Sequence, residues 1–166
     1  MFTISCSATG NVHVNYEYDH EINFNKMRSF DWFPVPKYNV RYDLIVKQIK
    51  HELKMQLHDK GLEQDPAKPD FLIAIHGGIQ PRLAHDDWIY LNTNYNQYWI
   101  KRRMDIVNYH DEMLIVDVID TTSKTLIYRA TASAFTSIEP SYDKRSEAIN
   151  KTIAKILENF PPIEAI

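Results

Sequence analysis

The chain has 166 residues and a formal net charge of −3, with 44% hydrophobic and 25% charged residues. This length and composition are typical of one globular domain that can bury a core without disulfides. The slight negative charge gives no electrostatic basis for binding nucleic acid. The sequence has no glycine-rich phosphate-binding motif and no apolar run of about 18 residues, so it predicts neither a nucleotide loop nor a membrane-spanning helix.

The N-terminal residues 1–10 are interpreted as a tether or signal remnant, and residues 11–166 as a single domain. Cys6 is the only cysteine, which excludes an internal disulfide. It directly follows Ser5, as the modified cysteine follows a small residue in a bacterial lipoprotein signal. Only five residues precede it, too few for the charged and hydrophobic regions of such a signal. A shortened signal with lipidation at Cys6 and an ordinary free thiol both stay open on these residues.

The first half of the chain predicts two strands, a helix and a third strand. Residues 12–18 alternate apolar and polar side chains, which is typical of a half-buried strand. Residues 30–33 read as a short strand that prolines end. Residues 39–60 carry apolar side chains every four positions, which predicts an amphipathic helix with Gly61 just beyond its end. Residues 70–79 predict a central strand.

The second half predicts a hairpin followed by a helix. The apolar runs on either side of Thr122–Lys124 indicate two strands joined by a tight turn, with Lys124 in the left-handed region. Counting outward from this turn sets Asp120 opposite Leu126 and Val118 opposite Tyr128. A second amphipathic helix is predicted from about residue 141 or 143 to residue 160. Pro161 and Pro162 end it.

These elements predict an α+β fold, a mainly antiparallel sheet with two helices packed on one face. Each helix has a single apolar stripe to bury, so both stripes are expected on the same side of the sheet. The same counting turns Ile115, Ile119 and Ile127 toward the opposite, open face. An exposed apolar patch of this kind often marks a partner surface, so we expect a homodimer or another protein partner there.

The ordered set of these segments resembles the bacterial family called "domain of unknown function 4136". The matching pieces are Tyr18-Asp19, Phe24, Ser29-Phe30-Asp31-Trp32, Lys60-Gly61, Pro69-Asp70-Phe71-Leu72-Ile73, Tyr109, Leu114 to Asp120, Leu126 to Ala130, and Phe160-Pro161-Pro162. The chain departs from the family where Lys124 and Met113 replace glycines and where Tyr128-Arg129-Ala130 replaces Trp-Arg-Gly. The resemblance implies an exported, envelope-associated domain, favours lipidation of Cys6, and implies no activity.

The sharpest charged pair is Asp117 with Arg129, which the hairpin sets opposite each other. The structural interpretation is that the two side chains form a cross-strand ion pair within the sheet. The functional alternative is a charged site on an open face of the sheet. We favour the structural ion pair.

Acidic and histidine clusters are weak candidates for chemistry. His76, His85, Asp86 and Asp87 match no established metal spacing, so no metal is expected. The segment His110-Asp111-Glu112 and Asp120 could supply groups for acid–base chemistry, but the sequence has no nucleophile elbow. No catalytic residues and no cofactor are therefore expected.

An aromatic segment at residues 88–99, followed by three basic residues, is the best binding candidate. Its large aromatic side chains are Trp88, Tyr90, Tyr95, Tyr98 and Trp99. Aromatic side chains interleaved with basic residues can stack on sugars, peptides or nucleobases. They can equally be strand residues, half of which lie in the core. Both interpretations stay open.

The resulting hypothesis is a non-enzymatic envelope domain that a lipid on Cys6 holds at the periplasmic face of a membrane. It would act by protein contact. A small-ligand binder that uses residues 88–99 is the alternative, and a hydrolase of unrecognised type is the third.

Overall fold

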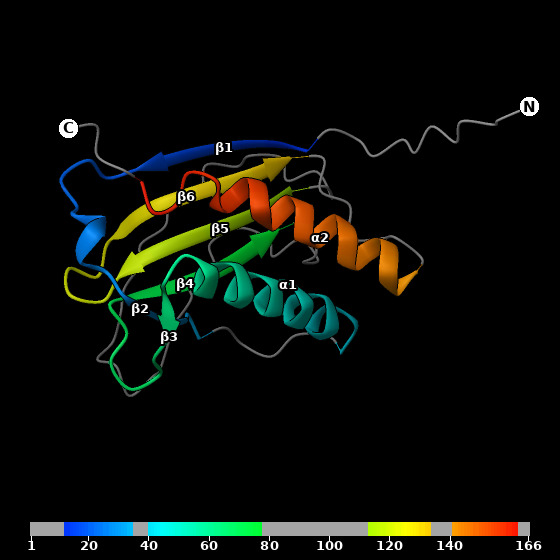
Figure 1. Cartoon of the computed structure of the whole chain (residues 1–166), viewed down its shortest axis with the longest axis horizontal. Coiled ribbons are helices and arrows are strands. Elements are labelled where there is room, and N and C mark those ends of the chain that lie inside the picture. Colours follow the sequence, from blue (N-terminus) through cyan, green and yellow to red (C-terminus); the bar gives the residue numbers. More distant parts are fainter. Residues whose placement is uncertain (1–11, 35–39, 78–112, 134–140, 163–166) are drawn as a thin grey trace, which may run out of the picture.

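The computed structural model describes residues 12–34, 40–77, 113–133 and 141–162. They form one six-stranded sheet in the order β1-β6-β5-β4-β2-β3, with two helices lying across it (Figure 1). The elements in chain order are β1 (His13–Tyr18), the short 3-10 helix η1 (Phe24–Lys26), β2 (Ser29–Trp32), α1 (Val40–Asp59), β3 (Glu63–Gln64), β4 (Phe71–Gly77), β5 (Met113–Asp120), β6 (Leu126–Ser133) and α2 (Tyr142–Leu157). Neither α1 nor α2 combines the length and hydrophobicity that a bilayer-spanning helix requires.

The sheet is mixed, so the prediction of a mainly antiparallel sheet was wrong, although the α+β class and the two helices are confirmed. β1, β6, β5 and β4 pair antiparallel in succession, whereas β2 pairs parallel with both β4 and β3. The parallel part follows from α1, because the chain leaves β2, crosses over through this helix and returns in the same direction.

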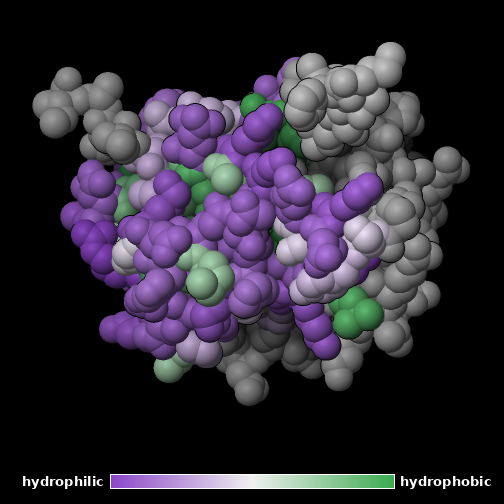
Figure 2. All heavy atoms as spheres, turned by 45° about the vertical axis from the view of Figure 1, so that its right-hand side comes forward, coloured by the Kyte–Doolittle hydropathy of each residue, from purple (hydrophilic) through white to green (hydrophobic). Residues whose placement is uncertain are grey.

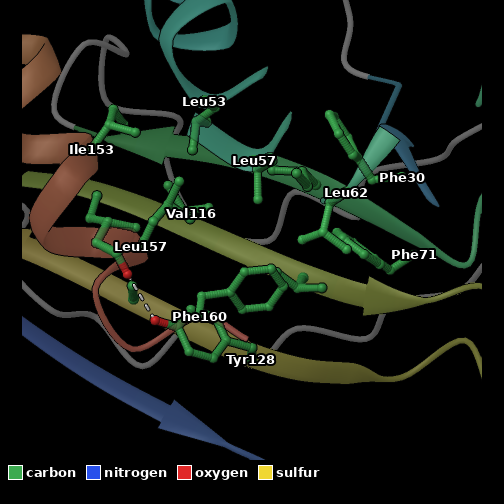
Figure 3. Close-up of a cluster of buried hydrophobic side chains, with 14 of the residues drawn as sticks. Phe30, Leu53, Leu57, Leu62, Phe71, Val116, Tyr128, Ile153, Leu157 and Phe160 are labelled. Atoms are coloured by element: carbon green, nitrogen blue, oxygen red, sulfur yellow. Dashed lines mark hydrogen bonds between the residues drawn. The ribbon is translucent and has the colours of Figure 1, made fainter. Parts of the chain in front are cut away.

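Both helices turn their apolar stripes toward the same face of the sheet, as predicted. Leu53 and Leu57 of α1 meet Ile153 and Leu157 of α2 above the sheet (Figure 3). These four side chains are almost completely buried, so the main core lies between the helix layer and the sheet. On the face that Figure 2 shows, the described residues are mostly hydrophilic, and hydrophobic residues appear in small separate patches.

Local signals set the ends of the helices. Gly61 follows α1 with a φ of 80°, the left-handed conformation expected of a glycine just beyond a helix. The side chain of Ser141 caps α2 by accepting a hydrogen bond from the backbone N–H of Lys144 at 3.2 Å.

The β5–β6 hairpin has the predicted register in its middle and a different one near its turn. Val118 pairs with Tyr128 as expected, and Lys124 adopts the left-handed conformation with a φ of 64°. Leu126 pairs with Ile119, however, and not with Asp120 as predicted. The register shifts at this point because Ile127 is an extra residue in β6, which makes a β-bulge that counting from the turn did not include.

The expectation that Ile115, Ile119 and Ile127 lie exposed on an open sheet face was wrong. Their exposed fractions are 4%, 6% and 1%. Ile127 belongs to the main core, because the bulge turns it to the same side as Tyr128. Ile119 packs in a second apolar cluster with Phe33. The prediction assumed that only the helix side of the sheet is buried, whereas both faces of the central strands are buried.

Candidate functional site

Several residues selected from the sequence lie outside the described residues. They are Cys6, the aromatic candidates Trp88, Tyr90, Tyr95, Tyr98 and Trp99, and the polar residues His85, Asp86, Asp87, His110, Asp111 and Glu112. Within the described ranges, no three His, Cys, Asp or Glu residues gather in a way that could hold a metal ion.

Asp117 and Arg129 form the ion pair that the hairpin register predicted. The Nε and Nη2 atoms of Arg129 donate to the two carboxylate oxygens of Asp117 at 2.7 and 2.9 Å. The side chain of Asp117 is 5% exposed and that of Arg129 is 31% exposed. Because both carboxylate oxygens accept from one guanidinium in a fixed geometry, this arrangement favours the structural interpretation over a reactive one.

The most distinctive accessible feature is the outer edge of β1, which is the first strand of the sheet. β6 pairs with one side of β1, and no strand among the described residues pairs with the other side (Figure 1). His13, Asn15, Tyr16 and Glu17 are all exposed. An edge strand of this kind presents backbone N–H and C=O groups in a row, ready to pair with another chain.

The direction of the backbone groups in β1 follows from one hydrogen bond just beyond the strand. The N–H of Asp19 donates to the carbonyl of Ile127 in β6 at 2.9 Å. Because alternate residues of an antiparallel pair bond to the same neighbour, the backbone groups of Asn15 and Glu17 also face β6. Those of Val14, Tyr16 and Tyr18 therefore point away from the sheet, along the outer edge. We call these three residues the outer row.

The side chains of the outer row lie on the helix side of the sheet, where two tyrosines stack beside a third. The ring of Tyr16 stacks on Tyr18 and on Tyr128, with centroid distances of 6.4 and 6.2 Å. Tyr16 is nevertheless 42% exposed. The row thus presents a partly exposed aromatic surface next to the open backbone groups.

Tyr128 anchors the outer row to the core through its contact with Tyr16. Its hydroxyl donates to the carbonyl of Ile156 at 3.0 Å, and its ring packs edge-on against Phe160 (Figure 3). Burial, with a smaller contribution from nearby Tyr16, raises the pKa of the Tyr128 hydroxyl far above its ordinary value. Tyr128 is therefore a neutral, fixed support for Tyr16.

Two further polar arrangements are ordinary surface features. The Nζ of Lys50 lies 5.0 Å from the ring centroid of Trp32. Burial lowers the pKa of Lys50, and the nearby charge of Asp31 partly opposes this shift. Nδ1 of His58 lies 2.7 Å from Glu63, with both side chains mostly exposed.

Sequence reasoning identified residues 12–18 as a strand but missed that its outer side is open. The alternation of apolar and polar residues is the same for an edge strand as for an inner strand with one buried face. The exposure of four of the six residues of β1 became visible only in the structure.

A family model described as "Domain of unknown function (DUF4136)" matches residues 14–162 of the chain. No curated protein sequence matches the chain.

Among solved structures, a PDZ domain protein from Parabacteroides distasonis ATCC 8503 is similar over 93% of this chain, with a TM-score of 0.53 and 14% identity. The chain spans only 37% of the length of that protein. A PelC dodecamer from Paraburkholderia phytofirmans is similar over 89% of this chain and 95% of its own, with a TM-score of 0.47 and 13% identity. At such low identity, the likeness to the PDZ domain protein shows a shared fold and nothing more.

Proposed function

The chain belongs to this family of domains of unknown function, and we propose that it is a non-enzymatic interaction domain of the cell envelope. It acts by protein contact at the outer edge of β1, where a strand of another chain pairs with the outer row. The observation that supports this proposal is the open side of β1, with Val14, Tyr16 and Tyr18 directing their backbone groups away from the sheet.

Strand addition is a recurring mode of recognition because it satisfies the free backbone groups of an edge strand. The partner's backbone supplies hydrogen bonds, and side chains at alternate positions supply selectivity. Tyr16 contributes here, because it is held against Tyr18 and Tyr128 and is still 42% exposed. A ring that is already fixed loses little conformational entropy when a partner covers it.

The non-enzymatic part of the proposal is supported by the way in which the sharpest charged pair is used. Asp117 is held by Arg129 through two hydrogen bonds and is almost completely buried. A carboxylate that is engaged in this way serves the sheet rather than a substrate.

The envelope part of the proposal concerns Cys6, which would carry a lipid. Six peptide units separate Cys6 from Val12, where the described domain begins. A fully extended segment of that length spans at most about 20 Å. A lipid on Cys6 would therefore keep the β1 edge close to the membrane surface, where it would meet other membrane-held chains at high local concentration.

Photo-cross-linking in native membranes tests the contact. A photoreactive p-benzoylphenylalanine replaces Tyr16 in one variant and Met55 in a control. The control is matched because Met55 is 49% exposed but lies on α1, away from β1. We expect a cross-linked protein from position 16 only.

The same cross-link should disappear when Val14→Pro is added to the variant with the photoreactive residue at position 16. Proline removes the outward N–H of residue 14 and leaves the pairing with β6 in place. Equal cross-linking from positions 16 and 55, or a cross-link that survives Val14→Pro, would contradict the proposed contact.

Mass spectrometry of the membrane-extracted protein tests the tether. We expect a lipid-sized mass increase on the peptide that contains Cys6, and its loss together with release from membranes in Cys6→Ser. An unmodified Cys6 in the membrane-extracted protein would refute the tether and leave the β1 contact to be judged by cross-linking alone.

A further inference from the structure

We propose that the strand added to β1 is β1 of a second copy of this chain, paired antiparallel about a two-fold axis that passes beside Tyr16. This inference rests on the proposed use of the β1 edge and names its partner.

A two-fold antiparallel pairing requires outward backbone groups at equivalent positions of both strands. Centring the axis at Tyr16 sets Tyr16 against Tyr16 of the second copy, and Val14 against its Tyr18. All three residues direct their N–H and C=O groups outward, as derived from the bond between Asp19 and Ile127. Each pair therefore exchanges two hydrogen bonds, and no outward group of the row is left over.

On the helix side of the sheet, this pairing brings aromatic and β-branched side chains together. Tyr16 meets its own copy across the axis, and Val14 meets Tyr18. Aromatic pairs and aromatic–β-branched pairs are among the favourable cross-strand combinations. Tyr16 is already positioned by stacking on Tyr18 and Tyr128, so its exposed fraction is available to the second copy.

On the other side of the sheet, the same pairing avoids like charges. Asn15 lies opposite Glu17 of the second copy, and His13 lies opposite its Asp19. All four side chains are exposed in the single chain. An amide faces a carboxylate and an imidazole faces a carboxylate, so no like charges are set directly opposite each other.

The two neighbouring registers are poorer. A shift in one direction sets Glu17 opposite Glu17, which places like charges directly across the pair. A shift in the other direction sets Asn15 opposite itself and brings Val12 into the pairing. The carbonyl of Val12 already accepts a hydrogen bond from Nζ of Lys155 at 2.9 Å, so a new strand would compete with Lys155 for this carbonyl in that register. The register centred at Tyr16 avoids both penalties.

The paired sheet would run continuously through both copies, with both helix layers on the same side. Such a contact is isologous, since the same patch is used twice, and it closes after two copies. The opposite edge, β3, is only two residues long and offers little for further growth of the sheet.

Disulfide formation between introduced cysteines tests the register in the full chain carrying Cys6→Ser. Asn15→Cys and Glu17→Cys are made in separate variants, and Met55→Cys is the exposed control. Positions 15 and 17 form a pair without mutual backbone hydrogen bonds, whose Cα atoms lie about 4.5 Å apart, within the range that a disulfide spans. Under mild oxidation, we expect mixed Asn15→Cys and Glu17→Cys to cross-link at least about tenfold faster than either variant alone.

Other outcomes of this test overturn the proposed pairing. Cross-linking of Glu17→Cys with itself or of Asn15→Cys with itself would indicate one of the shifted registers. A mixed rate no higher than that of Met55→Cys would indicate that the two β1 strands do not meet.

Sedimentation equilibrium of the Cys6→Ser chain gives an independent test. We expect a monomer–dimer equilibrium whose dissociation constant rises by about tenfold or more in Tyr16→Pro. A strict monomer at millimolar concentration overturns this inference. If Tyr16 then still cross-links to a different protein in membranes, the proposed function stands without it, and if no cross-link forms at all, both fail.

Discussion

The two edge strands, β1 and β3, are built differently, although both belong to the same six-stranded sheet. β3 is two residues long, and its neighbour β2 is tied into the core through Phe30, which is completely buried. β1 is six residues long, mostly exposed, and has neither proline nor lysine along its length. Short edges and charged or proline-containing edges are the usual protection against unwanted pairing. Among the described residues, the β3 edge therefore leaves few backbone groups unpaired, whereas the β1 edge leaves a longer and mostly exposed row of them.

The largest expected difference between the two edges is in their contribution to folding. Phe30→Ala should lower the free energy of unfolding by about 3–5 kcal/mol, because it leaves a cavity among Phe71 and the other core residues. Tyr16→Ala should lower it by less than about 1 kcal/mol, because Tyr16 is 42% exposed. Urea denaturation of both variants in the Cys6→Ser chain at low concentration measures this. A loss from Tyr16→Ala as large as that from Phe30→Ala would mean that the β1 edge serves stability rather than contact.

Proline substitutions within β1 distinguish the backbone N–H groups that face β6 from those that face outward. Glu17→Pro removes an N–H that faces β6 and should lower the free energy of unfolding by about 2–3 kcal/mol. Tyr16→Pro removes an N–H that points outward and should lower it by less than about 1 kcal/mol. Thermal unfolding monitored by circular dichroism shows which of the two variants loses more stability. Equal losses would show that the alternation derived from the Asp19–Ile127 hydrogen bond is wrong.

A third prediction concerns Asp70, which ties β4 to the start of β2. Its carboxylate accepts hydrogen bonds from the backbone N–H groups of Arg28 and Ser29 at 2.8 and 2.9 Å. Burial by itself raises the pKa of Asp70, but these hydrogen bonds outweigh it and leave the pKa below its ordinary value. Because the carboxylate is partly exposed and solvent screens it, we expect Asp70→Asn to lower the free energy of unfolding by only about 1 kcal/mol at neutral pH.

The sign of the pH dependence follows from the lowered pKa of Asp70. A group whose pKa is lower in the folded state stabilises the fold above its unfolded pKa of about 4, and that contribution is lost as the pH falls through the folded pKa. The difference between the native chain and Asp70→Asn should therefore shrink below about pH 4. Glu17→Gln, at the exposed β1 edge, is the matched control and should change stability by less than about 0.5 kcal/mol. If the stability difference between the native chain and Asp70→Asn grew on acidification, the pKa of Asp70 would not be lowered in the folded state.

Part of the candidate site was predictable and part was not. The alternation in residues 12–18 identified β1 as a strand, and the hairpin register correctly paired Asp117 with Arg129. The stacking of Tyr16 on Tyr128 was not predictable, because it depends on β1 lying next to β6, more than a hundred residues away in the chain. The burial of Ile127 was missed because a single extra residue in β6 reverses the face of its side chain.

The amino-acid sequence by itself determined the features that depend on neighbours along the chain. The four-residue spacing in α1, Gly61 after it, and the left-handed turn at Lys124 were all readable, because helix periodicity and turn chemistry act over a few residues. The tertiary structure alone decided which strands became edges, where the parallel pairing begins, and that both faces of the central strands are buried. These depend on which distant segments meet, and a residue's preference for a pleated, half-buried surface is the same whichever strand lies beside it.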